Sequence, residues 1–234
     1  MSDPSQNAEH DIIRSWHINA VPWATALRHQ SIASRRLVTD QAIIDAVRSV
    51  DPHRVLDVGC GEGWLARALG RPGVDVLGID VVPDLISEAR RLGPGRFEVH
   101  SYLDVASKRL DCGTFDAAVC NFSLLGKESV EALVGAVGAY LNVPGYFIVQ
   151  TLHPLAACGD HPYHDGWRTG SWAGFSPDFS DPAPWYFRTL ASWYAMLRRC
   201  GFEVIECREP TARDAAAPAS LIFICSQHST AARE

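Results

Sequence analysis

The stretch Val55-Leu-Asp-Val-Gly-Cys-Gly-Glu-Gly63 indicates the fold of this chain. An apolar strand runs directly into three alternating glycines, and the residues from Trp64 onward have helical spacing. Glycine allows a sharp turn out of a strand and a close approach of backbone to a ligand. The helix that follows such a turn presents unpaired N–H groups. We therefore expect a strand–turn–helix unit with a ligand site at the tip of the strand.

Apolar segments that predict strands alternate with helical segments on both sides of this stretch. Five strands are expected at residues 54–58, 74–79, 97–102, 115–120 and 145–151, and two closing strands at 202–207 and 220–225. Alternating strands and helices predict a parallel sheet with right-handed crossovers. The closing strands have no helix between them, so they should pair antiparallel. The sequence thus predicts an α/β fold with a doubly wound, mostly parallel seven-stranded sheet and an antiparallel edge strand.

The chain is expected to have two parts. Residues 1–50 should form an N-terminal helical cap, because Trp16 and Trp23 mark an apolar stripe. Residues 51–234 should form the main domain, with a lid at about 153–186. This segment has no helical or strand period, and long loops of that kind are usually functional or disordered. It is too aromatic for disorder, so we expect it to cover the end of the fifth strand.

Composition narrows the class of protein. The chain has 234 residues, 47% hydrophobic and 21% charged, which is typical of a globular domain. The net charge of −6 disfavours a nucleic-acid partner. There is no signal-like or membrane-length apolar run, and the seven cysteines form no CxxC pair. We expect a cytoplasmic protein with no nucleic-acid, membrane or metal partner, and the oligomeric state stays open.

The glycine stretch resembles the first signature motif of class I S-adenosylmethionine-dependent methyltransferases, an apolar strand and an acidic residue followed by Gly-x-Gly-x-Gly. Leu77-Gly-Ile-Asp80 resembles the second motif, in which an acidic residue ends the second strand. Residues 115–121 resemble the fourth-strand motif, and Val143-Pro-Gly-Tyr-Phe resembles the turn into the fifth strand. The resemblance covers about residues 54–227. It implies a Rossmann-like methyltransferase fold with S-adenosyl-L-methionine as the cofactor, and it identifies no subfamily.

Two alternative functions remain open. An NAD-type oxidoreductase would carry Gly-x-Gly-x-x-Gly, whose third glycine packs the helix against the strand. Trp64 stands at that third position and fits the contact poorly. A non-catalytic module that only binds the cofactor is the other alternative, because fold analogy does not establish function.

The resemblance also implies a cofactor pocket. Asp57 would take the amino group of the cofactor, and Asp80 would accept hydrogen bonds from both ribose hydroxyls. The glycine loop would lie against the methionine and ribose, Val81 would flank the adenine, and either Tyr102 or Asp104 would contact it. The full expected cofactor set is Asp57, Gly59, Cys60, Gly61, Gly63, Asp80, Val81, Tyr102, Asp104 and Asn121.

Class I enzymes place the methyl acceptor beside the end of the fourth strand. Enzymes that methylate amino groups of bases or glutamine often show Asn/Asp-Pro-Pro-Tyr/Phe there, whereas this chain has Asn121-Phe-Ser-Leu. That difference lowers the case for methylation of nucleic acid or protein. It favours a small-molecule acceptor, with a hydroxyl or other nucleophile on an aromatic or acidic metabolite.

His153, directly after the fifth strand, is the predicted general base, and a purely structural histidine is the alternative. Aromatic lid residues suit a planar acceptor, and arginines suit an acidic group on it. The N-terminal segment should close the site, with the Arg35–Arg36 pair as a further candidate contact. The expected substrate set is Trp23, Tyr163, Trp167, Arg168, Trp185 and Arg188.

Overall fold

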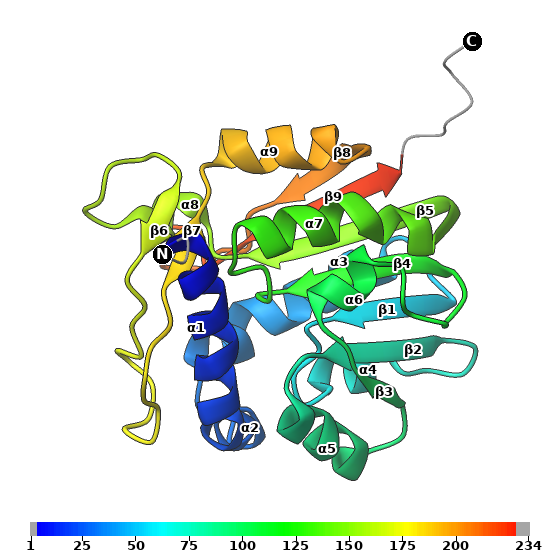
Figure 1. Ribbon diagram of the computed structural model, residues 1–234, viewed down its shortest axis with the longest axis horizontal. Helices are drawn as coiled ribbons and strands as arrows, with labels where there is room; N and C mark the ends of the chain where they lie inside the picture. The colour runs from blue at the N-terminus through cyan, green and yellow to red at the C-terminus, as the bar shows by residue number, and fades with distance from the viewer. Residues whose placement is uncertain (1–3, 228–234) are drawn as a thin grey trace.

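A seven-stranded sheet forms the centre of the protein (Figure 1), whose computed structural model describes residues 4–227. The strands follow the order β3 (Arg96–Val99), β2 (Asp75–Asp80), β1 (Arg54–Val58), β4 (Phe115–Asn121), β5 (Leu141–Thr151), β9 (Leu221–Gln227) and β8 (Phe202–Arg208). The first five of these are parallel. β9 runs antiparallel to both β5 and the edge strand β8. The predicted α/β architecture with antiparallel pairing at one edge is confirmed.

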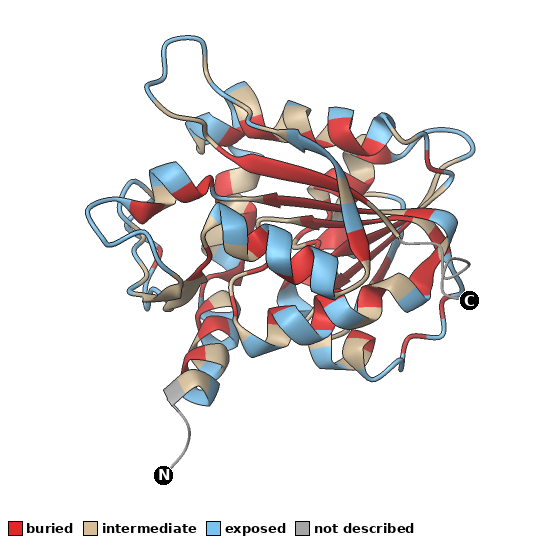
Figure 2. Ribbon diagram, turned by 90° about the horizontal axis from the view of Figure 1, so that it is seen from above, coloured by how far each residue is buried: buried red, intermediate tan, exposed pale blue. Residues whose placement is uncertain are grey.

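Helices cover both faces of this sheet (Figure 1). One face carries α3 (Asp40–Arg48), α4 (Trp64–Leu69) and α5 (Pro83–Leu92), and the other carries α6 (Tyr102–Ala106), α7 (Glu128–Val137) and α9 (Leu190–Arg199). A short 3-10 turn, Gly138–Tyr140, links α7 to β5. Figure 2 shows the central strands as a buried layer between the helices. Two covered faces explain why β1 and β4 are buried nearly throughout.

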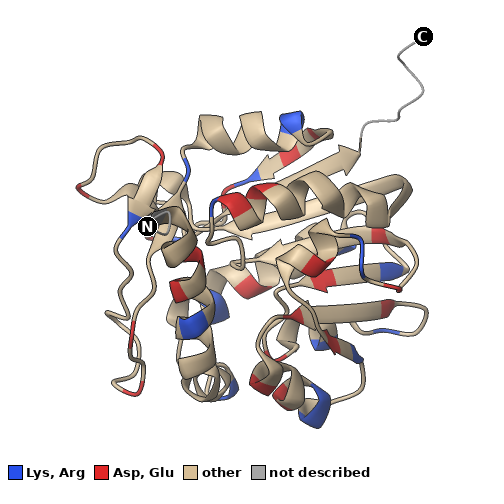
Figure 3. Cartoon of the chain, in the orientation of Figure 1, with Lys and Arg blue, Asp and Glu red and all other residues tan. Residues whose placement is uncertain are grey.

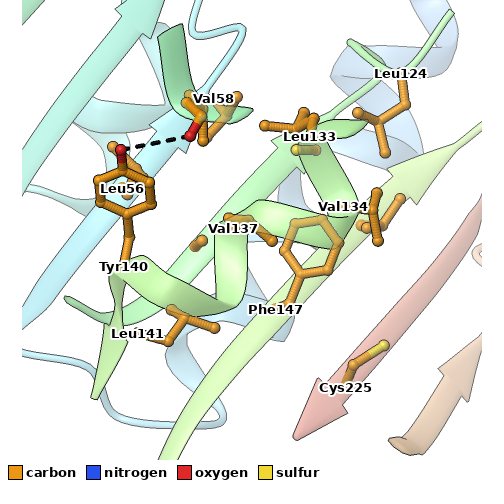
Figure 4. Close-up of a cluster of buried hydrophobic side chains, with 14 of the residues drawn as sticks. Leu56, Val58, Leu124, Leu133, Val134, Val137, Tyr140, Leu141, Phe147 and Cys225 are labelled. Carbon is orange, nitrogen blue, oxygen red and sulfur yellow. Dashed lines mark hydrogen bonds between the residues drawn. The ribbon is translucent and has the colours of Figure 1, made fainter. Parts of the chain in front are cut away.

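The central strands divide their side chains between two cores. In β4, Ala117 and Val119 face the α3–α5 side, whereas Ala118 and Cys120 face the α6–α9 side. This is the period of two that a pleated strand imposes. Figure 4 shows the second core, where side chains of α7 meet Phe147 of β5. The strand predictions succeeded because this burial leaves apolar runs in the sequence.

The remaining elements lie beyond the carboxyl ends of the parallel strands (Figure 1). They are α1 (Pro4–Ile18), α2 (Ala20–Arg28), a π-turn at Arg35–Thr39, α8 (Pro154–Cys158) and the hairpin of β6 (Gly166–Arg168) and β7 (Trp185–Phe187). The lid therefore contains regular structure that its sequence did not indicate. α3 packs against the sheet although it lies within residues 1–50, and the division into a cap and a main domain stays a prediction.

The third strand is shorter than expected. β3 ends at Val99, and α6 begins at Tyr102. Ser101 is the reason: its hydroxyl accepts from the N–H of Asp104, while the Asp104 carboxylate accepts from the N–H of Ser101 at 2.8 Å. This reciprocal capping box starts a helix, and it puts Tyr102 and Asp104 on that helix.

Positive and negative charges are mixed along the described part of the chain. In Figure 3, Lys and Arg are interspersed with Asp and Glu along the elements, and no basic stripe crosses this view. Between residues 4 and 227, no helix is both long and apolar enough to cross a membrane.

Glu9 joins the N-terminal helix α1 to the start of α7. α7 has no side-chain cap of its own at Lys127. The Glu9 carboxylate accepts from the N–H of Lys127 at 2.7 Å and from the N–H and hydroxyl of Ser129. A carboxylate at a helix N-terminus also interacts favourably with the helix dipole. α1 thus supplies from a distant part of the chain the cap that α7 lacks.

Replacing Glu9→Ala should lower the free energy of unfolding by about 1–2 kcal/mol, because it leaves the start of α7 without its acceptor. Urea unfolding followed by circular dichroism measures this. Asp11→Ala is the matched control on the same helix, since Asp11 makes an exposed ion pair with Arg14. Equal effects of the two changes would contradict the capping role.

Candidate functional site

The turn between β1 and α4 combines tight packing with one open position. Gly59, Gly61 and Gly63 all have positive φ, at 77°, 58° and 79°. A Cβ on Gly59 would lie 2.4 Å from the Cβ of Ser123, and one on Gly63 would lie 2.6 Å from the Phe97 ring. The nearest atom to a Cβ on Gly61 is 3.6 Å away. Two glycines therefore serve packing and backbone shape, whereas Gly61 leaves room for a ligand to approach.

Asp80 closes this turn from the neighbouring strand. Its Oδ2 accepts from the N–H of Gly61 at 2.9 Å, and its Oδ1 accepts from the N–H of Val82 at 2.9 Å. Each carboxylate oxygen keeps further acceptor capacity. Burial raises the pKa of Asp80, and the N–H donors oppose that shift. The carboxylate is thus fixed at the tip of β2 with lone pairs available to a ligand.

Asp57 is a buried carboxylate without a partner. Its side chain is 1% exposed, and its Oδ2 has no hydrogen-bond partner among the described residues. Burial raises the pKa of Asp57 to about 8, and the nearby charges of Asp80 and Glu62 add to the shift. An isolated buried carboxylate is costly unless a cation or donor compensates it. Asp57 therefore suits a positively charged ligand group.

The other expected cofactor residues occupy different surroundings. The Cys60 side chain is buried in the α3–α5 core, where burial raises its thiol pKa, so only its backbone faces the turn. Val81, like Trp16 and Trp23, packs against the buried cluster of Ala20, Val82 and Leu85. The Asn121 Oδ1 is buried at the end of β4 and has no hydrogen-bond partner among the described residues. Val81 and Asn121 thus lie beside the turn.

Tyr102 and Asp104 do not act alike. The Tyr102 hydroxyl donates to the Ser123 carbonyl at 2.8 Å, which brings this ring to the Gly59 side of the turn. Asp104 caps α6 and pairs with Arg109 at 2.9 Å. Those hydrogen bonds keep the pKa of Asp104 below its usual range. The geometry gives Asp104 a capping role in place of the expected adenine contact.

A cavity of about 290 Å³ adjoins the turn at the carboxyl ends of β4 and β5. Trp23 connects the two spaces, because its Nε1 is the atom nearest to the position that a Cβ on Gly61 would take, and its side chain also lines the cavity. Aromatic side chains dominate the wall: Trp16, Trp23, Phe122, Trp172, Phe175, Trp185, Tyr186, Phe187 and Trp193. Such a wall suits a planar or apolar molecule.

The lid docks on α1 beside this cavity. Asn19, which is fully buried, donates to the Ser180 carbonyl at 2.7 Å and accepts from the Ser180 N–H at 2.9 Å. Trp16 packs edge-on against Trp172, with ring centroids 5.9 Å apart. Side-chain and backbone contacts between the two segments therefore hold the lid against α1, and both tryptophans line the cavity.

The structure brings half of the expected substrate residues to the cavity. Trp23, Trp185 and Arg188 line it. The other three lie in the lid outside the wall: the Tyr163 hydroxyl accepts from the Leu190 N–H, Trp167 packs against Tyr186, and Arg168 donates to the carbonyls of Pro162 and His164. The contacts of Tyr163, Trp167 and Arg168 hold the lid together.

His153 lies outside the cavity wall and caps α8, where its Nδ1 accepts from the Leu155 N–H at 3.2 Å. Its Nε2 lies 2.8 Å from Glu209 Oε1 and donates to it. Both ring nitrogens thus have partners within the protein. These contacts favour the structural alternative for His153, and its role as a general base stays a prediction.

Three aromatic residues of the wall were not in the expected substrate set: Trp16, Trp172 and Phe175. Trp16 stands more than 150 residues before the other two, and nothing local in the sequence brings them together. Arg35, which the sequence offered as a candidate contact, also lines the cavity. Arg35 is 8% exposed, with its guanidinium 4.6 Å from the Trp64 ring and its Nε 2.9 Å from Asp40 Oδ1. Arg35 begins the π-turn Arg35–Thr39, and π-turns are frequent at functional sites.

Comparison with known proteins establishes the family. The model of the methyltransferase domain matches residues 30–207. The chain belongs to this family. The ubiquinone biosynthesis O-methyltransferase of Xanthomonas axonopodis is 35% identical over 109 residues, which is 44% of this chain and 45% of that protein. That of Xylella fastidiosa is 34% identical over 114 residues, or 47% and 46%. The methyltransferase thus spans about half the length of the curated relatives it matches.

Solved structures share its fold. A S-adenosylmethionine dependent methyltransferase from Mesorhizobium loti is 25% identical with a TM-score of 0.60, covering 78% of this chain and 96% of that one. The 1,6-didemethyltoxoflavin-N1-methyltransferase of Burkholderia thailandensis, solved with S-adenosylhomocysteine, is 18% identical with a TM-score of 0.64, covering 98% and 92%. The sequence-based identification as a class I S-adenosylmethionine-dependent methyltransferase is confirmed.

Asp57→Asn should change how stability depends on pH. The pKa of about 8 means that the folded protein holds a proton on Asp57 that the unfolded chain releases above its ordinary value of 3.8. Wild-type stability therefore falls between about pH 4 and 8, by at most about 1.4 kcal/mol per pH unit from this group. Asn does not titrate, so the variant should gain relative to wild type as pH rises through this window.

Urea unfolding at pH 5, 6, 7 and 8 measures the difference between the two proteins. Asp84→Asn, an exposed position in the first turn of α5, is the control and should follow the wild-type curve. Parallel curves for Asp57→Asn and wild type would show that Asp57 is ionised in the free protein.

Proposed function

We propose that the protein transfers a methyl group from S-adenosylmethionine to a nucleophile on a small, planar acceptor. One observation carries this proposal: a glycine turn with two acidic side chains opens beside an aromatic cavity, and Trp23 borders both spaces. In open α/β sheets ligands bind outside the carboxyl ends of the strands, which is where both spaces lie. The site is thus suited to hold a donor and an acceptor side by side.

The charges of this chain fit the cofactor group by group. Asp80 would accept from the ribose hydroxyls, and Asp57 would compensate the ammonium group, which supplies the cation that this carboxylate lacks. Arg35 would meet the carboxylate, because hydrogen bonds among the described residues use only its Nε. The stacked rings of Trp23 and Trp64 hold this guanidinium in place. The ribose of a dinucleotide is uncharged, so it carries no pair of opposite charges for Asp57 and Arg35 to bind.

When bound, the cofactor supplies an already activated methyl group on a sulfonium centre. The protein then has to align the acceptor and exclude water, and alignment contributes on the order of 7–11 kcal/mol in favourable cases. The aromatic wall can hold a ring in one plane, and the lid docked through Asn19 supplies part of that wall. These two features are what the chain itself contributes to the reaction.

Two further properties are part of the proposal. Oxygen is the preferred nucleophile, which the name of the Xanthomonas and Xylella relatives supports. A reducing compartment such as the cytoplasm is the preferred location, which the seven free cysteine thiols support.

Calorimetric titration with S-adenosylmethionine, S-adenosylhomocysteine and NAD tests the proposal. We expect micromolar binding of the first two and no binding of NAD. Asp80→Ala should weaken cofactor binding by about 100-fold or more, because two charge-assisted hydrogen bonds of about 1.5–3 kcal/mol each are lost. Asp84→Ala, on the exposed start of α5, should leave the affinity unchanged.

Binding of NAD alone would overturn the proposed chemistry and favour an oxidoreductase. Unchanged affinity in Asp80→Ala would exclude the ribose contact. The identity of the cofactor would still be decided by the titration of the wild type.

A further inference from the structure

Arg188 is a buried cation on the cavity wall. The residue is 4% exposed, and it follows β7 directly. Its Nη1 donates to the Gly126 carbonyl at 2.8 Å and its Nη2 to the Lys127 carbonyl at 3.0 Å. The rings of Tyr186 and Trp193 lie 4.8 and 5.3 Å from the guanidinium carbon. These bonds use two of its five N–H groups, so an oriented guanidinium still has donors for a ligand.

The surroundings offset this charge only in part. A carboxylate oxygen of Glu131 in α7 is 4.0 Å from Nη2 and belongs to a half-exposed side chain. Asp165 of the lid and Glu9 of α1 also favour the charge, but both carboxylates are hydrogen-bonded to other groups. Burial lowers the pKa of Arg188, which reflects the cost of keeping the charge there. An anion in the cavity would offset that cost.

The wall offers an acceptor no group that can remove its proton. Of the described residues that line the cavity, none is Asp, Glu or His, and the charged ones are Arg35 and Arg188. Arg35 pairs with Asp40, and in the proposed function it meets the carboxylate of the cofactor. Arg188 is therefore the charge left for the acceptor.

We propose that the acceptor is an aromatic molecule with an acidic O–H group, bound as its oxyanion against Arg188. This inference rests on the proposed methyl transfer and names its substrate class. The acceptor gives its proton to water before or on binding. Its oxygen then forms the bond to the methyl carbon, the sulfur–carbon bond breaks, and that electron pair stays on sulfur, so no base is needed in the cavity.

4-Nitrophenol is a suitable probe, because its phenolate absorbs visible light and forms near neutral pH. The protein is first saturated with S-adenosylhomocysteine, whose carboxylate occupies Arg35 in the proposed complex. The probe is then titrated between pH 6 and 9, and its absorbance and the quenching of tryptophan fluorescence are followed. We expect the bound probe to ionise at least about one pH unit lower than the free probe, which is a tenfold preference for the anion. 4-Nitroanisole, its neutral methyl ether, should bind more weakly than the phenolate.

Arg188→Met should abolish the preference for the anion and leave 4-nitroanisole binding in place. Arg54→Met is the matched control, since Arg54 also stacks on an aromatic ring and donates to two backbone carbonyls, but at the opposite end of the sheet. It should retain the preference. Preferential binding of neutral 4-nitrophenol by the wild type, or an anion preference that survives Arg188→Met, would overturn the inference. Absent S-adenosylhomocysteine binding would instead contradict the proposed function, and the wild-type measurement stands even if a variant fails to fold.

Discussion

Three left-handed backbone positions, at Gly59, Gly61 and Gly63, hold the elements of the site together. A side chain at position 59 would collide with Ser123 after β4, and one at position 63 would collide with Phe97 in β3, so only glycine fits at either position. The N–H of Gly61 then meets the carboxylate that ends β2. The turn that follows β1 thus contacts β2, β3 and the segment after β4. A side chain at either packed glycine would push them apart.

Opposite charges are separated across the site. Asp57 and Asp80 lie under the glycine turn, whereas Arg35 and Arg188 lie on the cavity side. Each is largely withheld from water, and burying an unpaired charge is costly. In the proposed complex, the ammonium and carboxylate groups of the cofactor would meet Asp57 and Arg35. The ribose hydroxyls would donate to Asp80, and an anionic acceptor would meet Arg188, so binding and stability should be linked in this protein.

The sequence predicted what depends on local pattern. The strand–turn–helix unit and Asp80 follow from glycine spacing and from the end of an apolar run, and the structure places them as expected. Arg168 and Arg188 are indistinguishable in the sequence, yet one bonds within the lid and the other lines the cavity. The difference arises from the β6–β7 pairing and from contacts to a loop more than 60 residues away. The partner of His153 was likewise not predictable, because Glu209 lies 56 residues later.

Loss of charge on methylation has a consequence for turnover. An oxyanion that becomes a methyl ether no longer interacts as an ion with Arg188, and charge-assisted hydrogen bonds are roughly twice as strong as neutral ones. The product therefore keeps the aromatic contacts but loses the interaction that distinguished the substrate. The contacts of the lid with α1, where Asn19 makes its paired bonds to Ser180, do not depend on the charge of the ligand. The charge on the ligand is therefore what makes the cavity hold the substrate more tightly than the product.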